Sequence, residues 1–250
     1  MTTFSSFSVG AQFAVDSAFK SRRTMAASIA RLSTGERTIH GSDPAGASVA
    51  DSMRSQARSA AVAARNSENG ISFLISAESI LMELATLNTR LRELAVQKTS
   101  GLLQTAEINA ITAEENAIII AADKIAETEL NNVDLLSEVS IAISVPGTLA
   151  HVGATSKPEL ASGVSNVDTQ MANIQKALGE VSAGINALKG HQSNMFSYAS
   201  NSDAAASRIL DTDFAKESSI LAQSSVLNQS ALAMVAQANR AQATLLTLLE

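Results

Sequence analysis

Side chains that could carry acid–base or metal chemistry are few in this 250-residue chain. The only histidines are His40, His151 and His191. None of them stands in a His-Glu-x-x-His pattern, which would place two zinc ligands one helical turn apart. The chain has no cysteine, so disulfides and thiolate metal sites are excluded. We therefore expect no bound metal, and we expect the histidines to be solvated or to lie at polar interfaces.

Asp211 and Asp213 are the carboxylates whose spacing could suggest acid–base catalysis. Side chains two positions apart on a helix do not face each other, so we expect these two to cap a helix or to form ion pairs. The glycines form no G-x-G-x-x-G pattern or phosphate-binding loop. The sequence therefore predicts no catalytic residue, no cofactor and no enzyme.

The composition favours long helices over sheets. The chain is 46% hydrophobic but only 3% aromatic, so its core must be aliphatic and rich in alanine. Only Pro44, Pro146 and Pro158 could interrupt a helix. A net charge of −6 without a basic run argues against nucleic acid and anionic membranes as partners. No apolar run is long enough to span a membrane, and the first basic residue is Lys20, which is not typical of a secretory signal peptide.

Apolar periodicity predicts a mainly α fold, with long antiparallel helices in a coiled-coil-like bundle and a small β-hairpin region. Asp43 followed by Pro44 is typical of a helix start, because it offers an N-cap acceptor and a preset φ. Between Val139 and Val145 the apolar residues alternate, which predicts a strand, and Pro146-Gly147 predicts its turn. The helices are expected at about 3–33, 44–100, 104–129, 164–209 and 215–250.

The two ends of the chain keep a coiled-coil rhythm without charge. No charged residue occurs before Asp16 or between Ser218 and Asn239. A helix with no charge on any face is usually covered by neighbours on several sides. We therefore expect the ends to pack together and then against other copies of the chain. The residues of this predicted seam are Phe4, Phe7, Ala11, Met25 and Leu32 at the N-terminal end, and Ile220, Leu227, Met234, Ala238, Leu245 and Leu248 at the C-terminal end.

Several segments, in order along the chain, resemble bacterial flagellin. They are Ala30–Gly35, Ala64–Ser72, Leu91–Gln97, Ser207–Glu217 and Ala236–Asn239, followed by leucines near the C-terminus. The stretch between Leu130 and Val164 is too short for the outer domains of larger flagellins, so the chain resembles a short form. The family's Phe-Asn-Gly before its first strand is replaced here by Leu130-Asn131-Asn132.

The resemblance implies a structural subunit of the flagellar filament. Such a subunit polymerises through its terminal helices into a helical tubular propeller used for swimming. Residues 1–42 with 211–250 would form the inner filament-core domain, where the terminal helices make an inner coiled coil. Residues 43–210 would form the bundle domain, with the β-hairpin at about 131–163.

The resemblance also implies partners and a location. The expected partners are further flagellin subunits, the hook-associated junction and cap proteins, and an export chaperone on the C-terminal segment. The filament would be extracellular, and the chain would be exported without a cleaved signal peptide. Arg90, Leu94 and Glu114 match positions through which flagellins contact Toll-like receptor 5. Leu94 also lies on the predicted bundle seam, so it is alternatively a core residue.

Three other classes of protein are alternatives to a filament subunit. A hook–filament junction protein shares the terminal helices but carries a distinct middle region, for which this chain has little room. A stand-alone coiled-coil adaptor would favour charged positions beside its seam, which the uncharged ends lack. An enzyme would need a nucleophile–base set, a metal set or a nucleotide loop.

Overall fold

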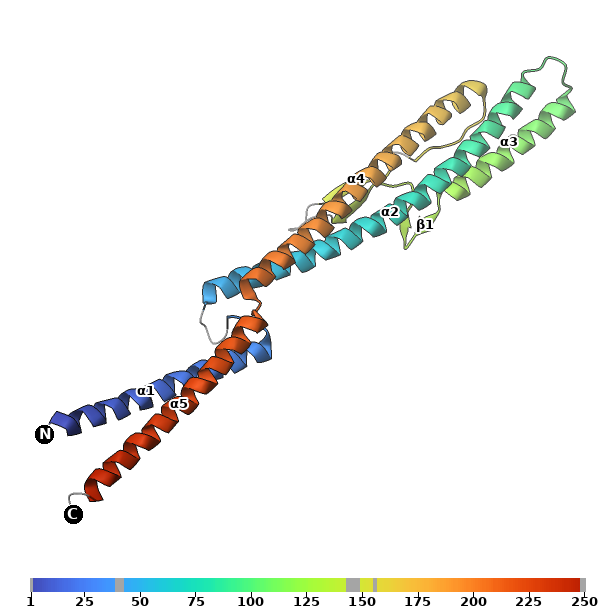
Figure 1. The fold of residues 1–250 in the computed structure, drawn as a ribbon. Coiled ribbons are helices and arrows are strands. Elements are labelled where there is room, and N and C mark those ends of the chain that lie inside the picture. The colour runs from blue at the N-terminus through green and yellow to red at the C-terminus, as the bar shows by residue number, and fades with distance from the viewer. Residues whose placement is uncertain (1, 39–42, 143–148, 155–156, 248–250) are drawn as a thin grey trace. The chain divides into compact units, whose positions relative to one another are not determined.

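A computed structural model describes residues 2–38, 43–142, 149–154 and 157–247. Its helices are α1 (Thr2–Thr34), α2 (Pro44–Lys98), α3 (Thr105–Ala126), α4 (Val164–Leu210) and α5 (Phe214–Thr247) (Figure 1). These bounds confirm the predicted mainly α fold and its five helices, with ends shifted by a few residues. The chain divides into two compact units. Unit 1 comprises residues 1–54 and 203–250, and unit 2 comprises residues 55–202.

The start of α2 follows from the two residues predicted to begin it. The Asp43 carboxylate accepts a hydrogen bond from the Gly46 amide at 2.9 Å, which satisfies an otherwise unpaired donor of the first turn. A side chain at Gly46 would overlap that carboxylate. The Asp43-Pro44 helix start is therefore confirmed, and it depends on glycine two residues later.

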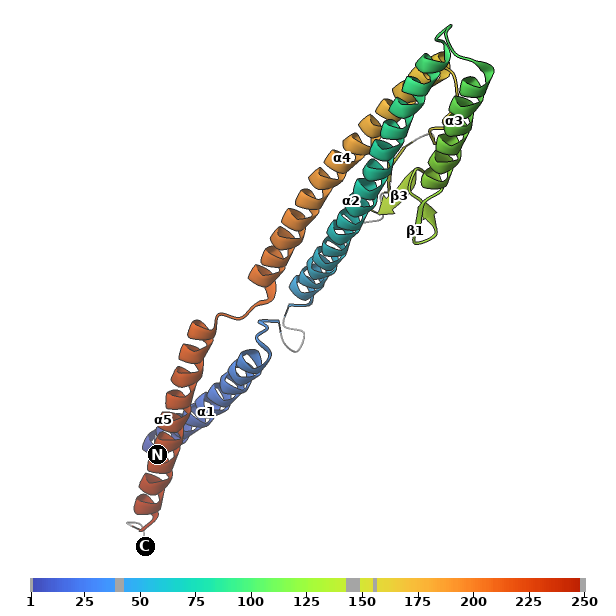
Figure 2. The same cartoon turned by 90° about the vertical axis from the view of Figure 1, so that its right-hand side faces the viewer.

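The core of unit 2 lies between α2, α3 and α4, which run side by side (Figures 1 and 2). Its largest buried side chains repeat at seven-residue intervals, and they include Leu74, Leu81, Leu84 and Leu91 on α2 and Val167, Ile174, Val181 and Leu188 on α4. On α4 these residues follow the three-and-four apolar spacing of the sequence, which predicts this face. On α2 the same spacing runs through Phe73, Ile80 and Leu84, but Leu74 and Leu81 are buried while Phe73 and Ile80 lie at the edge of the core.

By length and composition alone, α2 is the one helix among the described residues that could cross a membrane. A core helix of a soluble bundle meets the same criterion. Leu74, Leu81 and Leu84 of α2 are fully buried against the other helices of unit 2, although only 28% of the apolar stretch of this helix is buried.

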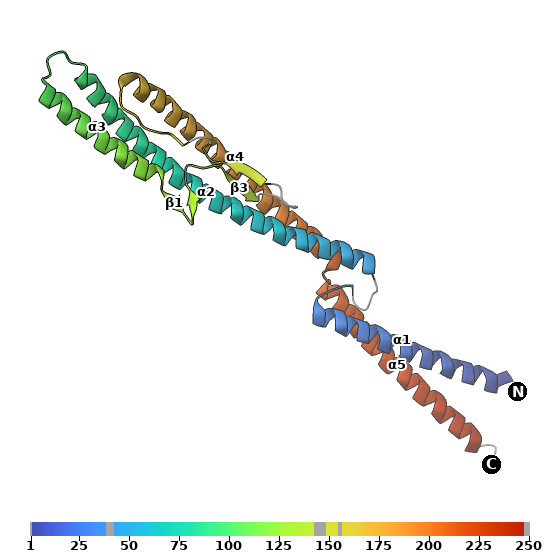
Figure 3. The same cartoon turned by 180° about the vertical axis from the view of Figure 1, so that it is seen from behind.

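A β-hairpin covers this core. Strand β3 (Val139–Ala142) pairs antiparallel with β4 (Leu149–Val152), and Val139 lies opposite Val152. This pairing confirms the predicted hairpin, while its predicted turn at Pro146-Gly147 lies outside the described residues. Figure 3 shows β3 beside α2 and α4. Strand β4 approaches α4 closely at Gly184. A Cβ atom added there would lie 3.0 Å from a methyl of Leu74 on α2 and 3.4 Å from Cβ of Val152 on β4.

A second, smaller hairpin that the sequence pattern did not predict precedes it. Strand β1 (Glu129–Leu130) pairs with β2 (Val133–Asp134). The two residues between them, Asn131 and Asn132, both have positive φ (54° and 61°). Two consecutive positive φ values are typical of a type I′ hairpin turn, and asparagine tolerates them. The Asn-Asn pair was the signal that could have predicted this turn.

In unit 1, α1 and α5 lie side by side (Figures 1 and 3). Apart from Glu217, the fully buried side chains of the two helices are small: Ala14, Ala18, Ser21 and Ser28 on α1, and Ser224 and Ala231 on α5. Asp213 caps α5, because its carboxylate accepts hydrogen bonds from the amides of Ala215 and Lys216 at 3.0 and 3.1 Å. The expectation that Asp213 caps a helix is therefore confirmed.

Candidate functional site: the apolar surface of the terminal helices

The predicted seam residues have different environments in the structure. Ala11, Met25 and Leu32 on α1, and Ile220 and Ala238 on α5, are half-buried. Leu227 and Met234 are exposed, at 48% and 64% of their surface. The side chains of Phe4, Phe7 and Leu245, and the whole of Leu248, lie outside the described residues. The structure thus brings part of the seam into the α1–α5 contact and leaves two of its large side chains in solvent.

Both terminal helices also expose large apolar side chains that the sequence analysis did not single out. Phe13 and Phe19 on α1 are 71% and 65% exposed. We call the full set the terminal surface: Val9, Phe13, Val15, Phe19, Ile29, Phe214, Val226, Leu227, Leu232 and Met234. Exposed apolar side chains also occur on unit 2, but those of the terminal surface include residues on uncharged stretches of helix, and contiguous apolar surface of this kind marks an interaction site. The sequence signal for Val9, Phe13 and Val226 was the absence of charge before Asp16 and between Ser218 and Asn239, whereas Phe19 and Ile29 lie among charged residues of α1.

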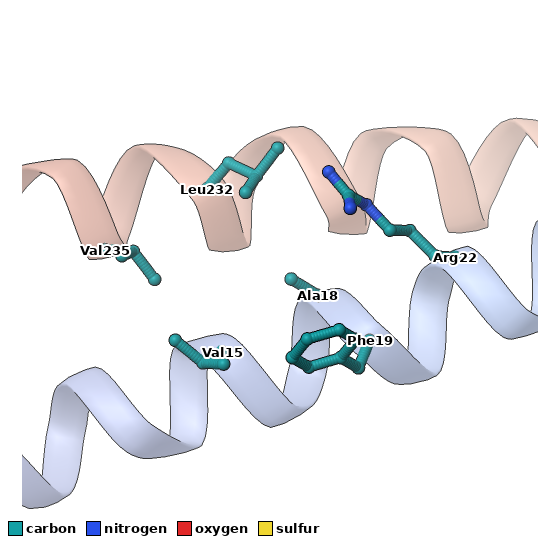
Figure 4. Close-up of a pocket in the computed structure, with 6 residues that line it drawn as sticks. All are labelled: Val15, Ala18, Phe19, Arg22, Leu232 and Val235. Atoms are coloured by element: carbon teal, nitrogen blue, oxygen red, sulfur yellow. The ribbon is translucent and has the colours of Figure 1, made fainter.

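A shallow hollow in the terminal surface lies between α1 and α5 (Figure 4). It has a volume of about 130 Å³. The lining residues are Val15, Ala18, Phe19 and Arg22 from α1 and Leu232 and Val235 from α5. Arg22 extends across toward α5, whereas the other five side chains are apolar. The hollow therefore fits an apolar side chain better than a polar ligand.

One ion pair joins the two terminal helices. The Arg31 Nε lies 3.5 Å from a carboxylate oxygen of Glu217, and the Glu217 side chain is almost fully buried. Glu217 occupies the first turn of α5, where the helix dipole also favours a negative charge. The pair links the end of α1 to the beginning of α5.

The three predicted receptor-contact residues lie in unit 2. The Arg90 guanidinium contacts Glu114 at 2.7 Å and Glu93 at 2.9 Å. Its hydrogen bonds to Glu114, and then those to Glu93, raise the pKa of Arg90 above its ordinary value. Arg90 and Glu114 are both exposed, whereas Leu94 is only 1% exposed and is part of the bundle interior.

The residues that could carry chemistry are dispersed. His151 lies on β4, where its Nδ1 is 3.1 Å from the Ser140 hydroxyl and 3.9 Å from Glu138, and His191 is exposed on α4. His40 lies outside the described residues. Within the described part of the chain, no three His, Asp or Glu side chains gather as a metal site would need. Asp211 forms an ion pair with Arg54 at 3.1 Å, which confirms the expectation that Asp211 caps a helix or forms an ion pair.

Two family models match the chain in the regions that form these helices. The bacterial flagellin N-terminal helical region matches residues 9–140, and the C-terminal helical region matches residues 164–249. The chain belongs to the bacterial flagellin family. Only residues 141–163 separate the two matches, which agrees with the predicted short form. Flagellins are structural proteins, so the expectation that the chain is not an enzyme is confirmed by its family.

Individual flagellins match along most of their length. The flagellar filament 33 kDa core protein of Treponema phagedenis is 31% identical, and the match covers 88% of this chain and 90% of that protein. Flagellin FlaB2 of Treponema pallidum is 30% identical, with 88% and 91% covered. A flagellin of Halalkalibacterium halodurans is 29% identical, with 88% and 89% covered.

Proposed function

We propose that this flagellin polymerises through the terminal surface of α1 and α5 into the tubular filament used for swimming. The chain is a structural subunit of the bacterial flagellar filament, an extracellular homopolymer. The observation that carries the proposal is the exposure of Phe13, Phe19 and Met234 on two helices that carry no charged side chain over residues 1–15 and 218–239. Burying such side chains contributes about 2–3 kcal/mol each, which a single soluble chain does not gain.

The finer organisation is proposed from the family resemblance. Residues 1–42 and 211–250 would form the inner core of the filament, and residues 43–210 the surrounding bundle domain. The chain would leave the cell without a cleaved signal peptide, with an export chaperone on its C-terminal segment. It would meet the hook-associated junction and cap proteins at the filament ends. The placement of the terminal helices in the inner core is supported by the apolar side chains that both helices expose, because neighbouring subunits could bury them.

Contact with Toll-like receptor 5 through Arg90, Leu94 and Glu114 also stays a proposal. In its favour, the Arg90–Glu114 pair is exposed on unit 2. Because Leu94 is buried, its part would be to hold α2 in place beneath Arg90 rather than to touch the receptor.

The test of polymerisation replaces exposed aromatic side chains of the terminal surface. Phe13→Ser and Phe19→Ser, singly and together, should leave the soluble chain helical, because both side chains are largely in solvent. Loss of two aromatic contacts per subunit should weaken the binding of a subunit to the filament end by about 4 kcal/mol. That is enough to stop elongation at micromolar subunit concentration. Elongation is measured by electron microscopy and light scattering after short filament seeds are added.

Ile120→Ser is the matched control. Ile120 is a large apolar side chain, also exposed, but it lies on α3 in unit 2. The control should elongate seeds normally. If the Phe13/Phe19 double variant elongates as fast as the wild-type chain, the terminal surface does not drive polymerisation.

A further inference from the structure

The two chain segments that connect the terminal helices to the rest of the molecule pair with each other. The Arg37 amide donates to the Leu210 carbonyl at 2.7 Å, and the Thr212 amide donates to the Gly35 carbonyl at 2.9 Å. These two bonds form an isolated antiparallel bridge in which Glu36 is opposite Asp211. We call this element the connector bridge. It lies entirely within unit 1.

The connector bridge places two carboxylates at close range. Its hydrogen bonds flank Glu36 and Asp211 instead of joining them, which is the pattern of a non-hydrogen-bonded antiparallel pair. In such a pair the Cα atoms are only about 4.5 Å apart and the side chains are closest. Like charges directly opposite each other destabilise a strand pair. A two-bond bridge has little other stabilisation to offset that repulsion.

Arg54, near the beginning of α2, contacts both carboxylates. Its Nη2 lies 3.1 Å from Asp211 Oδ1, and its Nη1 lies 3.6 Å from Glu36 Oε1. The Arg54 side chain is 28% exposed, while the Glu36 and Asp211 side chains are 48% and 52% exposed, so solvent screens the carboxylates more than the guanidinium between them. A guanidinium can engage two carboxylates at once, because its donors point in fixed, different directions.

Arg37 has a different task at the same place. Its Nε and Nη2 donate to the Ile209 carbonyl at 3.2 and 2.9 Å, which satisfies an acceptor near the end of α4. It contacts Asp43 at 3.6 Å, and among the described ion pairs it contacts neither Glu36 nor Asp211. Neutralising the facing carboxylates therefore falls to Arg54.

We propose that Arg54 is the positioning residue that keeps the connector bridge closed, and that a subunit adds to the filament efficiently only with this bridge closed. The second half rests on the proposed function, since it assumes growth through the terminal helices. With Arg54 in place, one cation compensates two facing anions and the two connectors are held together. Without it, Glu36 and Asp211 repel each other and the connectors separate, which loosens the attachment of α1 and α5.

The test is a mutant cycle that removes the cation and the two anions separately. Arg54→Gln leaves the carboxylates facing each other without compensation. The pair Glu36→Gln and Asp211→Asn removes the repulsion, and adding Arg54→Gln to that pair completes the cycle. Arg92→Gln is the control, because it removes an ion pair of similar length (2.8 Å to Asp168) in unit 2. The readouts are amide hydrogen exchange at Arg37 and Thr212 in the soluble chain, and the rate of seeded elongation.

We expect Arg54→Gln to speed exchange at Arg37 and Thr212 by about threefold to tenfold and to slow elongation. In the chain that already lacks both carboxylates, Arg54→Gln should change exchange less than twofold, and the triple variant should elongate faster than Arg54→Gln alone. Arg92→Gln should change neither readout.

Unchanged exchange in Arg54→Gln, or equal acceleration with and without the carboxylates, overturns the role of Arg54. Accelerated exchange with normal elongation overturns the link to assembly. Failure of the wild-type chain to polymerise overturns the proposed function and leaves the exchange cycle as a valid test of the bridge.

Discussion

Two glycines of unit 2 have opposite surroundings, and they make a matched pair for mutation. Gly153 has φ +127° and a new Cβ there would overlap the Ser137 carbonyl, whereas Gly179 is exposed on α4 with no atom within 4 Å. Gly153→Ala should lower the free energy of unfolding by about 2–4 kcal/mol, from backbone strain and overlap. Gly179→Ala should raise it by about 0.5–1 kcal/mol, because glycine is a poor residue in a helix interior.

Urea unfolding of the soluble chain, followed by circular dichroism, measures both changes. A Gly153→Ala chain as stable as the wild type would mean that the backbone after β4 is free to adopt another conformation. A destabilised Gly179→Ala chain would mean that this face of α4 is occupied within the monomer.

Individual polar residues also show which contacts could be predicted from the sequence and which could not. Asp43, Asp211 and Asp213 were predicted to cap helices or form ion pairs, and their hydrogen bonds and ion pairs agree. The burial of Glu115 was not predicted. Its carboxylate pairs with Lys98 at 2.9 Å across the α2–α3 turn. A carboxylate on a helix is normally exposed, and only the folded turn shows that a lysine from the preceding helix covers it.

At the scale of elements, the contact between α1 and α5 is set by side-chain size. Ala231 is buried against α1, so Ala231→Leu should force the helices apart and lower the stability of the terminal pair by about 1–3 kcal/mol. The measurement is hydrogen exchange of α1 and α5 amides in the soluble chain. Ala233→Leu, at an exposed position of α5, is the control and should leave exchange unchanged. Equal protection in both variants would show that Ala231 is not a packing residue.

Periodicity located the helices well but fixed their faces less well. Along α2, Phe73, Leu74, Ile80 and Leu81 are all apolar, so two adjacent faces are nearly equally hydrophobic. Packing against α4 on one side and α3 on the other widens the buried stripe, and the fully buried positions fall at Leu74 and Leu81. A one-residue difference of this kind depends on where the third helix packs, which the sequence of α2 does not contain.

At the scale of the whole chain, unit 2 should fold without the terminal helices. Its core residues all lie between Leu74 and Leu188, far from both ends. Removing residues 1–33 and 215–250 should therefore leave a helical chain with a cooperative thermal transition, measured by circular dichroism. The truncated chain should not elongate seeds, because the terminal surface is gone. Elongation by the truncated chain would assign polymerisation to the bundle instead.

The terminal surface could be predicted only in outline. The lack of charge over residues 1–15 and 218–239 indicated from the sequence alone that these stretches require neighbours on several sides. The sequence does not specify which large side chains face the other terminal helix and which remain outside. Leu227 and Met234 fit the seven-residue rhythm, yet they are exposed, because the small residues Ser224 and Ala231 fill the α1–α5 contact.

That contact of alanine and serine has a mechanical consequence. Helices that interlock through large side chains resist sliding, because each knob is held in its hole. Ala14, Ala18 and Ala231 offer no such knobs, whereas the larger half-buried side chains Met25, Leu32 and Ile220 lie toward the end of the contact that holds Arg31 and Glu217. The register of the α1–α5 pair is pinned at that end by the Arg31–Glu217 ion pair. Away from that end, interlocking side chains should therefore offer little resistance to sliding of α5 along α1.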